Sequence, residues 1–179
     1  SLHDALPISK VPVVPGTKEP VYTVEQALEA VKEIGFPVMI KASAGGGGKG
    51  MRVAGNEQEF AKLFETAQQE SVHSFSDNTM YLERFVENPR HVEVQILADK
   101  YGNVVHLGER DCSVQRRHQK MIEESPCIAI SDDLRKKMGE TAVRAAKAAG
   151  YESAGTIEFL LDQSGEFYFM EMNTRIQVE

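Results

Sequence analysis

The sequence has no tryptophan, only two cysteines, and fewer basic than acidic residues. Cys112 and Cys127 have neither C-x-x-C spacing nor the density of a disulfide scaffold, which excludes a zinc ribbon and a small disulfide-rich secreted domain. Lys and Arg number 20 against 27 Asp and Glu, and the net charge of −7 has the wrong sign for a general nucleic-acid binder. No apolar run approaches the ~18–20 residues that span a bilayer. We therefore expect a cytoplasmic protein with two free thiols and neither a membrane nor a nucleic-acid partner.

The ends of the sequence differ from those of a complete protein. The chain begins at Ser1 without an initiator Met, and it stops at Glu179 inside a segment that alternates apolar and polar residues. Its opening lacks the basic and apolar regions of a signal peptide. We interpret the chain as a fragment of a longer protein, with residues 1–9 as an unmatched leader that could be foreign.

Two kinds of spacing alternate along the chain. Apolar residues at helical spacing follow a capping residue at Thr23, Asn56 and Ser131, which predicts three helices. Elsewhere the period is two, which predicts strands. The strands are expected over residues 38–42, 51–54, 91–96, 104–106, 156–161 and 167–172. No clear period is present over 111–124. Strands paired in hairpins and interleaved with helices indicate an α+β fold rather than a doubly wound parallel sheet.

A glycine run, Gly45–Gly48, followed by Lys49 and Gly50, comes after the first expected strand. Gly45, Gly47 and Gly50 satisfy G-x-G-x-x-G, but a dinucleotide-binding fingerprint requires a helix next, and the next segment is predicted to be a strand. No Gly-Lys-Ser/Thr is present, which excludes a Walker A loop. We favour a flap whose backbone N–H groups cover nucleotide phosphates, because Lys41 and Lys49 flank it with positive charge. A flexible hairpin tip is the alternative.

The last expected hairpin brings two carboxylates together. With its turn centred on Ser164 and Gly165, opposing residue numbers sum to 329, so Glu158 faces Glu171 with the Cβ atoms roughly 5 Å apart. Facing like charges are destabilising, and apolar neighbours indicate partial burial. Either one carboxyl group holds a proton, or a divalent cation such as Mg²⁺ lies between them. A slipped register, or a pair splayed into solvent, is the alternative.

Polar residues continue at every second position after Glu171. The positions that share a face with Glu171 are Asn173, Arg175, Gln177 and Glu179. If the segment stays extended, this face carries groups able to bind an anion, a metal and a proton; an amphipathic edge strand is the other interpretation.

The basic stretch Gln115–Lys120 is short and lacks interleaved aromatic residues, so it indicates a phosphate or small-anion clamp rather than a nucleic-acid patch. Cys112, His118 and Cys127 lack zinc-site spacing, and no residue is singled out as a covalent nucleophile.

Four long segments, in order, resemble the biotin carboxylase family, and most of all the biotin carboxylase component of bacterial acetyl-CoA carboxylase. The resemblance begins near Lys10 and is carried by residues 40–52, 87–95, 109–120 and 171–179. It implies an ATP-grasp fold, in which two α+β lobes close on Mg-ATP, truncated here to residues 10–179 and incomplete at both ends. It also implies that ATP phosphorylates bicarbonate, and that the resulting carboxyphosphate supplies the carboxyl group to biotin on a carrier protein.

The resemblance also implies residue roles. Matched contacts to the nucleotide are Lys41, Gly47, Gly48, His91, Gln115 and His118. The adenine-binding hinge matches Glu83, Arg84, Phe85 and Val86, with Glu83 accepting from the adenine amino group. Ligands of Mg²⁺ or Mn²⁺ match Glu158, Glu171 and Asn173. The bicarbonate site matches Lys120, Arg175, Gln177, Val178 and Glu179. Of these, Lys120, Arg175 and Glu179 are the catalytic residues, with Glu179 as the base that deprotonates bicarbonate.

The implied partners are a biotin carboxyl carrier protein, a carboxyltransferase and, for the full-length protein, a second copy in a homodimer. The fragment alone is expected to be inactive. A related ligase such as carbamoyl phosphate synthetase is an alternative, against which the ending Arg175–Glu179 argues, because that ending is of the biotin-dependent type. A non-catalytic nucleotide-binding module is a third. Which acyl-CoA, or pyruvate, is finally carboxylated depends on the carboxyltransferase.

Overall fold

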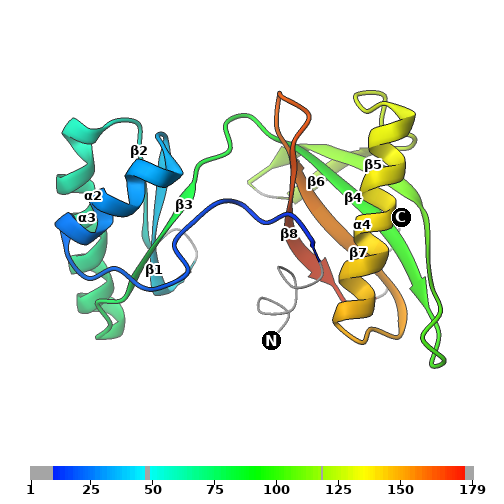
Figure 1. The fold of residues 1–179 in the computed structure, drawn as a ribbon, viewed down its shortest axis with the longest axis horizontal. Helices are drawn as coiled ribbons and strands as arrows, with labels where there is room; N and C mark the ends of the chain where they lie inside the picture. The colour runs from blue at the N-terminus through cyan, green and yellow to red at the C-terminus, as the bar shows by residue number, and fades with distance from the viewer. Residues whose placement is uncertain (1–9, 47–48, 118, 176–179) are drawn as a thin grey trace. The chain divides into compact units, whose positions relative to one another are not determined.

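The computed structural model describes residues 10–46, 49–117 and 119–175, which divide into two compact units. One unit is Val14–Val86, and the other consists of the described residues before and after it. Each unit is an antiparallel sheet with helical cover (Figure 1). The α+β class predicted from the sequence is confirmed. No helix in the described part of the chain is long and apolar enough to cross a membrane.

The unit Val14–Val86 is a three-stranded sheet against which two helices pack. Its elements are α2 (Val24–Ile34), β1 (Val38–Gly46), β2 (Lys49–Ala54), α3 (Glu57–Phe75) and β3 (Met80–Arg84). The strand order is β2-β1-β3. The core forms where fully buried aromatic rings of α3, Phe60 and Phe64, meet aliphatic side chains of the sheet such as Ile40 and Leu82.

The other unit is a five-stranded antiparallel sheet with one long helix. Its elements are β4 (Arg90–Ala98), β5 (Val104–Arg116), β6 (Gln119–Glu124), α4 (Asp132–Ala148), β7 (Ser153–Leu161) and β8 (Phe167–Asn173). The strand order is β6-β5-β4-β7-β8. Helix α4 covers one face of this sheet (Figure 1), where Met138 and Ala142 pack with Val94, Ile96 and Ile157. The alternating side chains of the strands therefore point to the opposite face.

The three predicted helix starts are confirmed in detail. The side chains of Thr23, Asn56 and Ser131 each accept a hydrogen bond from the backbone N–H three residues later, at 3.3, 3.2 and 3.2 Å. Each cap satisfies one N–H that the first helical turn leaves without an intrahelical partner.

Two expectations about the strands need correction. The stretch over 111–124 lies in the hairpin of β5 and β6. The register of this hairpin shifts at two places, which explains why the sequence has no regular alternation there. In the β7–β8 hairpin, Leu161 pairs with Phe167, so the register next to the turn is one residue away from the predicted sum. A register shift between Glu158 and Phe159 restores the predicted register on the side away from the turn. Glu158 therefore pairs with Glu171, as expected.

Candidate functional site

A polar cluster lies on the face of the five-stranded sheet opposite α4, and each strand contributes one residue to it. These residues are Glu93 of β4, Arg110 of β5, Lys120 of β6, Glu158 of β7 and Asn173 of β8. The alternation along β4 explains the placement of the first, because Val92 and Val94 on either side face the apolar core. The sheet thus brings together residues that are far apart in sequence.

The contacts within the polar cluster are charge-assisted hydrogen bonds. Lys120 Nζ donates to Glu158 Oε1 at 2.7 Å and also to Glu93 Oε2. Arg110 Nε donates to Glu93 Oε1 at 2.6 Å, and its terminal nitrogen donates to Gln95 Oε1 at 2.9 Å. The two carboxylates and two cations of the cluster are therefore paired at close range, and Arg110 Nε also lies 3.7 Å from Glu123 Oε2.

The surroundings stabilise the charged forms of both Glu93 and its partner Lys120. Glu93 is 1% exposed, and burial alone would raise its pKa, but the hydrogen bonds from Lys120 and Arg110 outweigh this and hold the pKa below its ordinary value. Burial would lower the pKa of Lys120, but its hydrogen bonds to Glu158 and Glu93 raise it. The ammonium and the carboxylate are therefore both ionised at neutral pH.

Glu158 and Glu171 occupy paired positions of β7 and β8, but their side chains have different surroundings. Glu158 is 5% exposed, and its Oε1 accepts from both Lys120 and the Asn173 side-chain amide, the latter at 2.8 Å. Glu171 is exposed. The sequence analysis proposed that a proton or a divalent cation relieves the repulsion between the two facing carboxylates. In the structure the Lys120 ammonium neutralises the charge of Glu158. The role of the two carboxylates as metal ligands stays a prediction.

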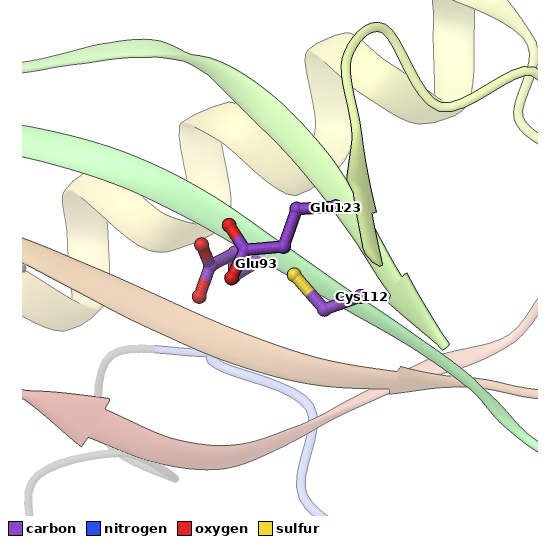
Figure 2. A group of neighbouring side chains, drawn as sticks. All are labelled: Glu93, Cys112 and Glu123. Carbon is purple, nitrogen blue, oxygen red and sulfur yellow. The ribbon is translucent and has the colours of Figure 1, made fainter. Parts of the chain in front are cut away.

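A second group of possible ligand atoms lies beside this cluster. The carboxylates of Glu93 and Glu123 and the Cys112 thiol have ligand atoms within 4.8 Å of one another (Figure 2). Both oxygens of Glu93 already accept from cations, and burial together with the Glu93 charge raises the pKa of Cys112 to about 12. In this structure the Glu93 oxygens are thus engaged by Lys120 and Arg110 and the Cys112 thiol is protonated, so we assign no metal to this group. Cys112 and Cys127 are both buried free thiols, as expected.

Two predicted nucleotide contacts lie in the unit Val14–Val86, where they contact each other. Lys41 of β1 and Glu83 of β3 form an ion pair, and about a third of each side chain is exposed. The strand register places Met39 opposite Glu83, so the two charged residues are diagonal neighbours on the sheet. The sequence analysis assigned the two residues to phosphate and adenine separately and missed this pairing.

The hairpin of β1 and β2, which carries the glycine-rich segment and is called the glycine hairpin below, contacts α3 through Glu70. The sequence analysis did not single out this residue. Glu70 Oε2 accepts from the Gly50 backbone N–H at 3.0 Å and lies 3.0 Å from an Arg52 terminal nitrogen. Strand β1 continues to Gly46 and β2 begins at Lys49, so the predicted loop is shorter than expected. An acidic residue on a helix gives no sign in the sequence of which turn it contacts.

The structure places the remaining predicted residues individually. The backbone N–H groups of Arg84 and Phe85 donate to Pro15 and Pro37 at 2.8 and 2.9 Å, next to the half-buried Val86. In the other unit, the backbone N–H of His91 donates to Ser113 Oγ at 3.0 Å. The Gln115 side-chain amide donates to the Cys112 carbonyl at 2.9 Å, and Arg175 is exposed. Outside the described residues lie Gly47, Gly48, His118, Gln177, Val178 and Glu179.

Comparison with known proteins identifies relatives of this chain. Residues 2–179 match the family described as "Carbamoyl-phosphate synthase L chain, ATP binding domain". A biotin carboxylase of Nostoc sp. is 62% identical over 169 residues, which cover 94% of this chain and 38% of that protein.

Solved structures of biotin carboxylases are also similar to this chain. Biotin carboxylase from Campylobacter jejuni, a "beta-gamma-ATP complex", has a TM-score of 0.82 and 53% identity, with 98% of this chain and 40% of that one covered. The biotin carboxylase domain of 2-oxoglutarate carboxylase from Hydrogenobacter thermophilus, in complex with MgADP and bicarbonate, has a TM-score of 0.80 and 50% identity, with 98% and 39% covered.

The chain spans about two fifths of the length of these relatives. Its α+β architecture is the ATP-grasp fold that the motifs imply. The chain belongs to the family of carbamoyl-phosphate synthase L chain ATP-binding domains, and the relatives that it resembles there are biotin carboxylases.

Proposed function

We propose that the complete protein containing this chain carboxylates biotin on a carrier protein, with ATP and bicarbonate as co-substrates. The observation that carries the proposal is the polar cluster, in which Lys120, Glu158 and Asn173 come together from three strands of one sheet face. The similarity to biotin carboxylases supports the same assignment. A bicarbonate oxygen would attack the γ-phosphorus of ATP and release ADP. The carboxyphosphate formed would then transfer its carboxyl group to a biotin nitrogen, which loses its proton, and release phosphate.

The unit Val14–Val86 would supply the nucleotide contacts. Lys41 would bind phosphate oxygens, together with backbone N–H groups of the glycine hairpin that includes Gly47 and Gly48. The hinge Glu83–Val86 would bind the adenine. Because Lys41 and Glu83 already neutralise each other, nucleotide binding would exchange this ion pair for contacts to the ligand.

The five-stranded sheet would supply the groups for the metal and for bicarbonate. Glu158, Glu171 and Asn173 offer two carboxylates and an amide oxygen, a donor set that fits Mg²⁺ or Mn²⁺. A bound divalent cation would neutralise charge on the transferring phosphoryl group. His91, Gln115 and His118 would bind the nucleotide. Bicarbonate would be bound by Lys120, Arg175, Gln177 and Val178 and deprotonated by Glu179.

The finer assignment is the first half-reaction of acetyl-CoA carboxylase in the cytoplasm. A biotin carboxyl carrier protein and a carboxyltransferase would be the partners, and the complete protein would be a homodimer. These assignments follow the motif resemblance. The 2-oxoglutarate carboxylase relative makes a different final acceptor the main competing possibility.

The function is tested by incubating the complete protein with ATP, Mg²⁺ and radiolabelled bicarbonate, with free biotin in one sample and ammonium in another. We expect ATP-dependent incorporation of label into biotin. Label that enters an ammonia-derived product instead would overturn the assignment in favour of a carbamoyl-phosphate-type ligase. Nucleotide binding without any ATP cleavage would favour a non-catalytic binding module.

A further inference from the structure

The Lys120 ammonium lies between two buried carboxylates that differ in their other partners. Glu93 accepts from Lys120 on one oxygen and from the Arg110 guanidinium on the other. Among the described residues, Lys120 is the only cation in contact with Glu158, whose other partner is the neutral Asn173 amide. Removing Lys120 would therefore leave Glu93 with a counter-charge and Glu158 without one.

Both contacts to Glu158 fall on the same oxygen. Oε1 accepts from Lys120 at 2.7 Å and from the Asn173 amide nitrogen at 2.8 Å. Asn173 and Glu158 are two of the three residues proposed as metal ligands, so Lys120 is in contact with a carboxylate that a bound cation would also contact. A divalent cation and an ammonium group at one buried carboxylate repel each other strongly, because Glu158 is only 5% exposed and is shielded from water.

We propose that Lys120 and a divalent cation compete for the Glu158 carboxylate, an inference that rests on the proposed function of this cluster. Without the cation, Lys120 neutralises Glu158. When the cation is bound, Lys120 leaves Glu158 and is retained by Glu93, which Arg110 holds in place. The N–H donors released from Glu158 become available to an anion. The ammonium therefore contributes to bicarbonate binding only after the metal is in place.

The competition is measured as Mn²⁺ binding to the complete protein by electron paramagnetic resonance, in the absence of nucleotide, bicarbonate and biotin. Because one neighbouring charge shifts the affinity of a carboxylate for a proton by about 1–3 orders of magnitude, Lys120→Gln should bind Mn²⁺ about tenfold more tightly or better. Lys120→Arg keeps the charge and should bind Mn²⁺ like the wild type. The remote control is Lys32→Gln, since Lys32 forms an exposed ion pair with Glu29 on its own helix and its loss changes the net charge equally.

An unchanged Mn²⁺ affinity in Lys120→Gln, or an equal gain in Lys32→Gln, would overturn the proposal. Glu158→Gln separates this failure from failure of the metal site itself, because loss of the ligand should abolish Mn²⁺ binding whatever Lys120 does. If Glu158→Gln abolishes Mn²⁺ binding while Lys120→Gln leaves the Mn²⁺ affinity unchanged, the metal site of the proposed function is supported and the competition is refuted.

The wild-type protein provides a second measurement that needs no substitution. The side-chain ammonium resonance of Lys120, observed by ¹H–¹⁵N NMR, should shift on titration with Mg²⁺ and saturate together with Mg²⁺ binding. A resonance that stays in place at saturating Mg²⁺ would show that Lys120 keeps its contact with Glu158, which contradicts the proposal.

Discussion

Lys120 Nζ lies 2.7 Å from Glu158 Oε1, although β5 and β4 separate the strands that carry the two residues. Neighbouring strands are about 4.8 Å apart, so the two backbones are on the order of 14 Å apart and the side chains meet only by extending across the sheet. The pair joins the edge strand β6 to β7. It also means that the charge state of the polar cluster depends on the whole sheet being assembled.

Glu93→Gln should destabilise the protein by about 3 kcal/mol at pH 7, because it removes one partner from a buried ion-pair network. The folded pKa of Glu93 is lowered, so its stabilising effect is present above the unfolded pKa of about 4.3 and is lost as the pH falls through the folded value. The difference from wild type, measured by urea unfolding, should therefore shrink as the pH falls from 7 toward 4 and below.

The matched control is Glu152→Gln, an exposed carboxyl in the same unit, which should change the free energy of unfolding by about 0.5 kcal/mol or less. A deficit for Glu93→Gln that stays the same from pH 7 to below pH 4 would mean that its effect is steric rather than electrostatic.

Cys112 should resist alkylation in the folded protein. Burial, aided by the Glu93 charge, raises its pKa to about 12, so about 10⁻⁴ of it is thiolate at pH 8, against about a quarter of an ordinary thiol. Iodoacetamide should modify it about a thousandfold more slowly than the urea-unfolded chain, as followed by peptide mass spectrometry. Modification of Cys112 at the same rate in both states would refute this assignment of its protonation state.

The helices and most strands could be predicted from the sequence because their signals are local. The caps at Thr23, Asn56 and Ser131 and the alternation of Val92, Val94 and Ile96 each involve residues close together in the chain. Local signals also predicted the hairpin that carries Glu158 and Glu171, because one short turn joins its strands. The two residues pair as predicted only because the register shift beside Glu158 offsets the one-residue difference at the turn.

The contacts of Lys120 could not be predicted in this way. Its strand lies in a hairpin with two register shifts, which obscure the period of two, and the order of the strands in the sheet is a non-local property. The pairing of Lys41 with Glu83 likewise depends on β1 lying beside β3 rather than on any motif. Motif resemblance predicted functional roles for these residues, but their mutual contacts required the fold.

Gly155→Ala should disturb the polar cluster through the backbone. A Cβ at Gly155 would lie 2.7 Å from the Asn173 carbonyl oxygen, so β8 would have to move away from β7 at a proposed metal ligand. We expect a loss of stability of about 1–3 kcal/mol and weaker Mn²⁺ binding. Thermal unfolding and Mn²⁺ titration measure the two effects.

Gly55→Ala is the control for this substitution, because its Cβ would meet only the flexible end of the Glu59 side chain at 3.1 Å. Equal losses of stability in the two variants, with Mn²⁺ binding unchanged in both, would show that the close approach of Gly155 to Asn173 has no functional consequence.

The most direct test of the account is the Mg²⁺ dependence of bicarbonate-dependent ATP cleavage by the Glu171→Gln variant of the complete protein. Glu171 is exposed, so the substitution should leave the fold and its thermal unfolding unchanged. The control is Glu166→Gln, which alters an exposed carboxyl in the turn of the same hairpin. The account predicts severe loss of ATP cleavage at low Mg²⁺ in Glu171→Gln and wild-type cleavage in Glu166→Gln. Wild-type cleavage by Glu171→Gln at low Mg²⁺ would contradict it.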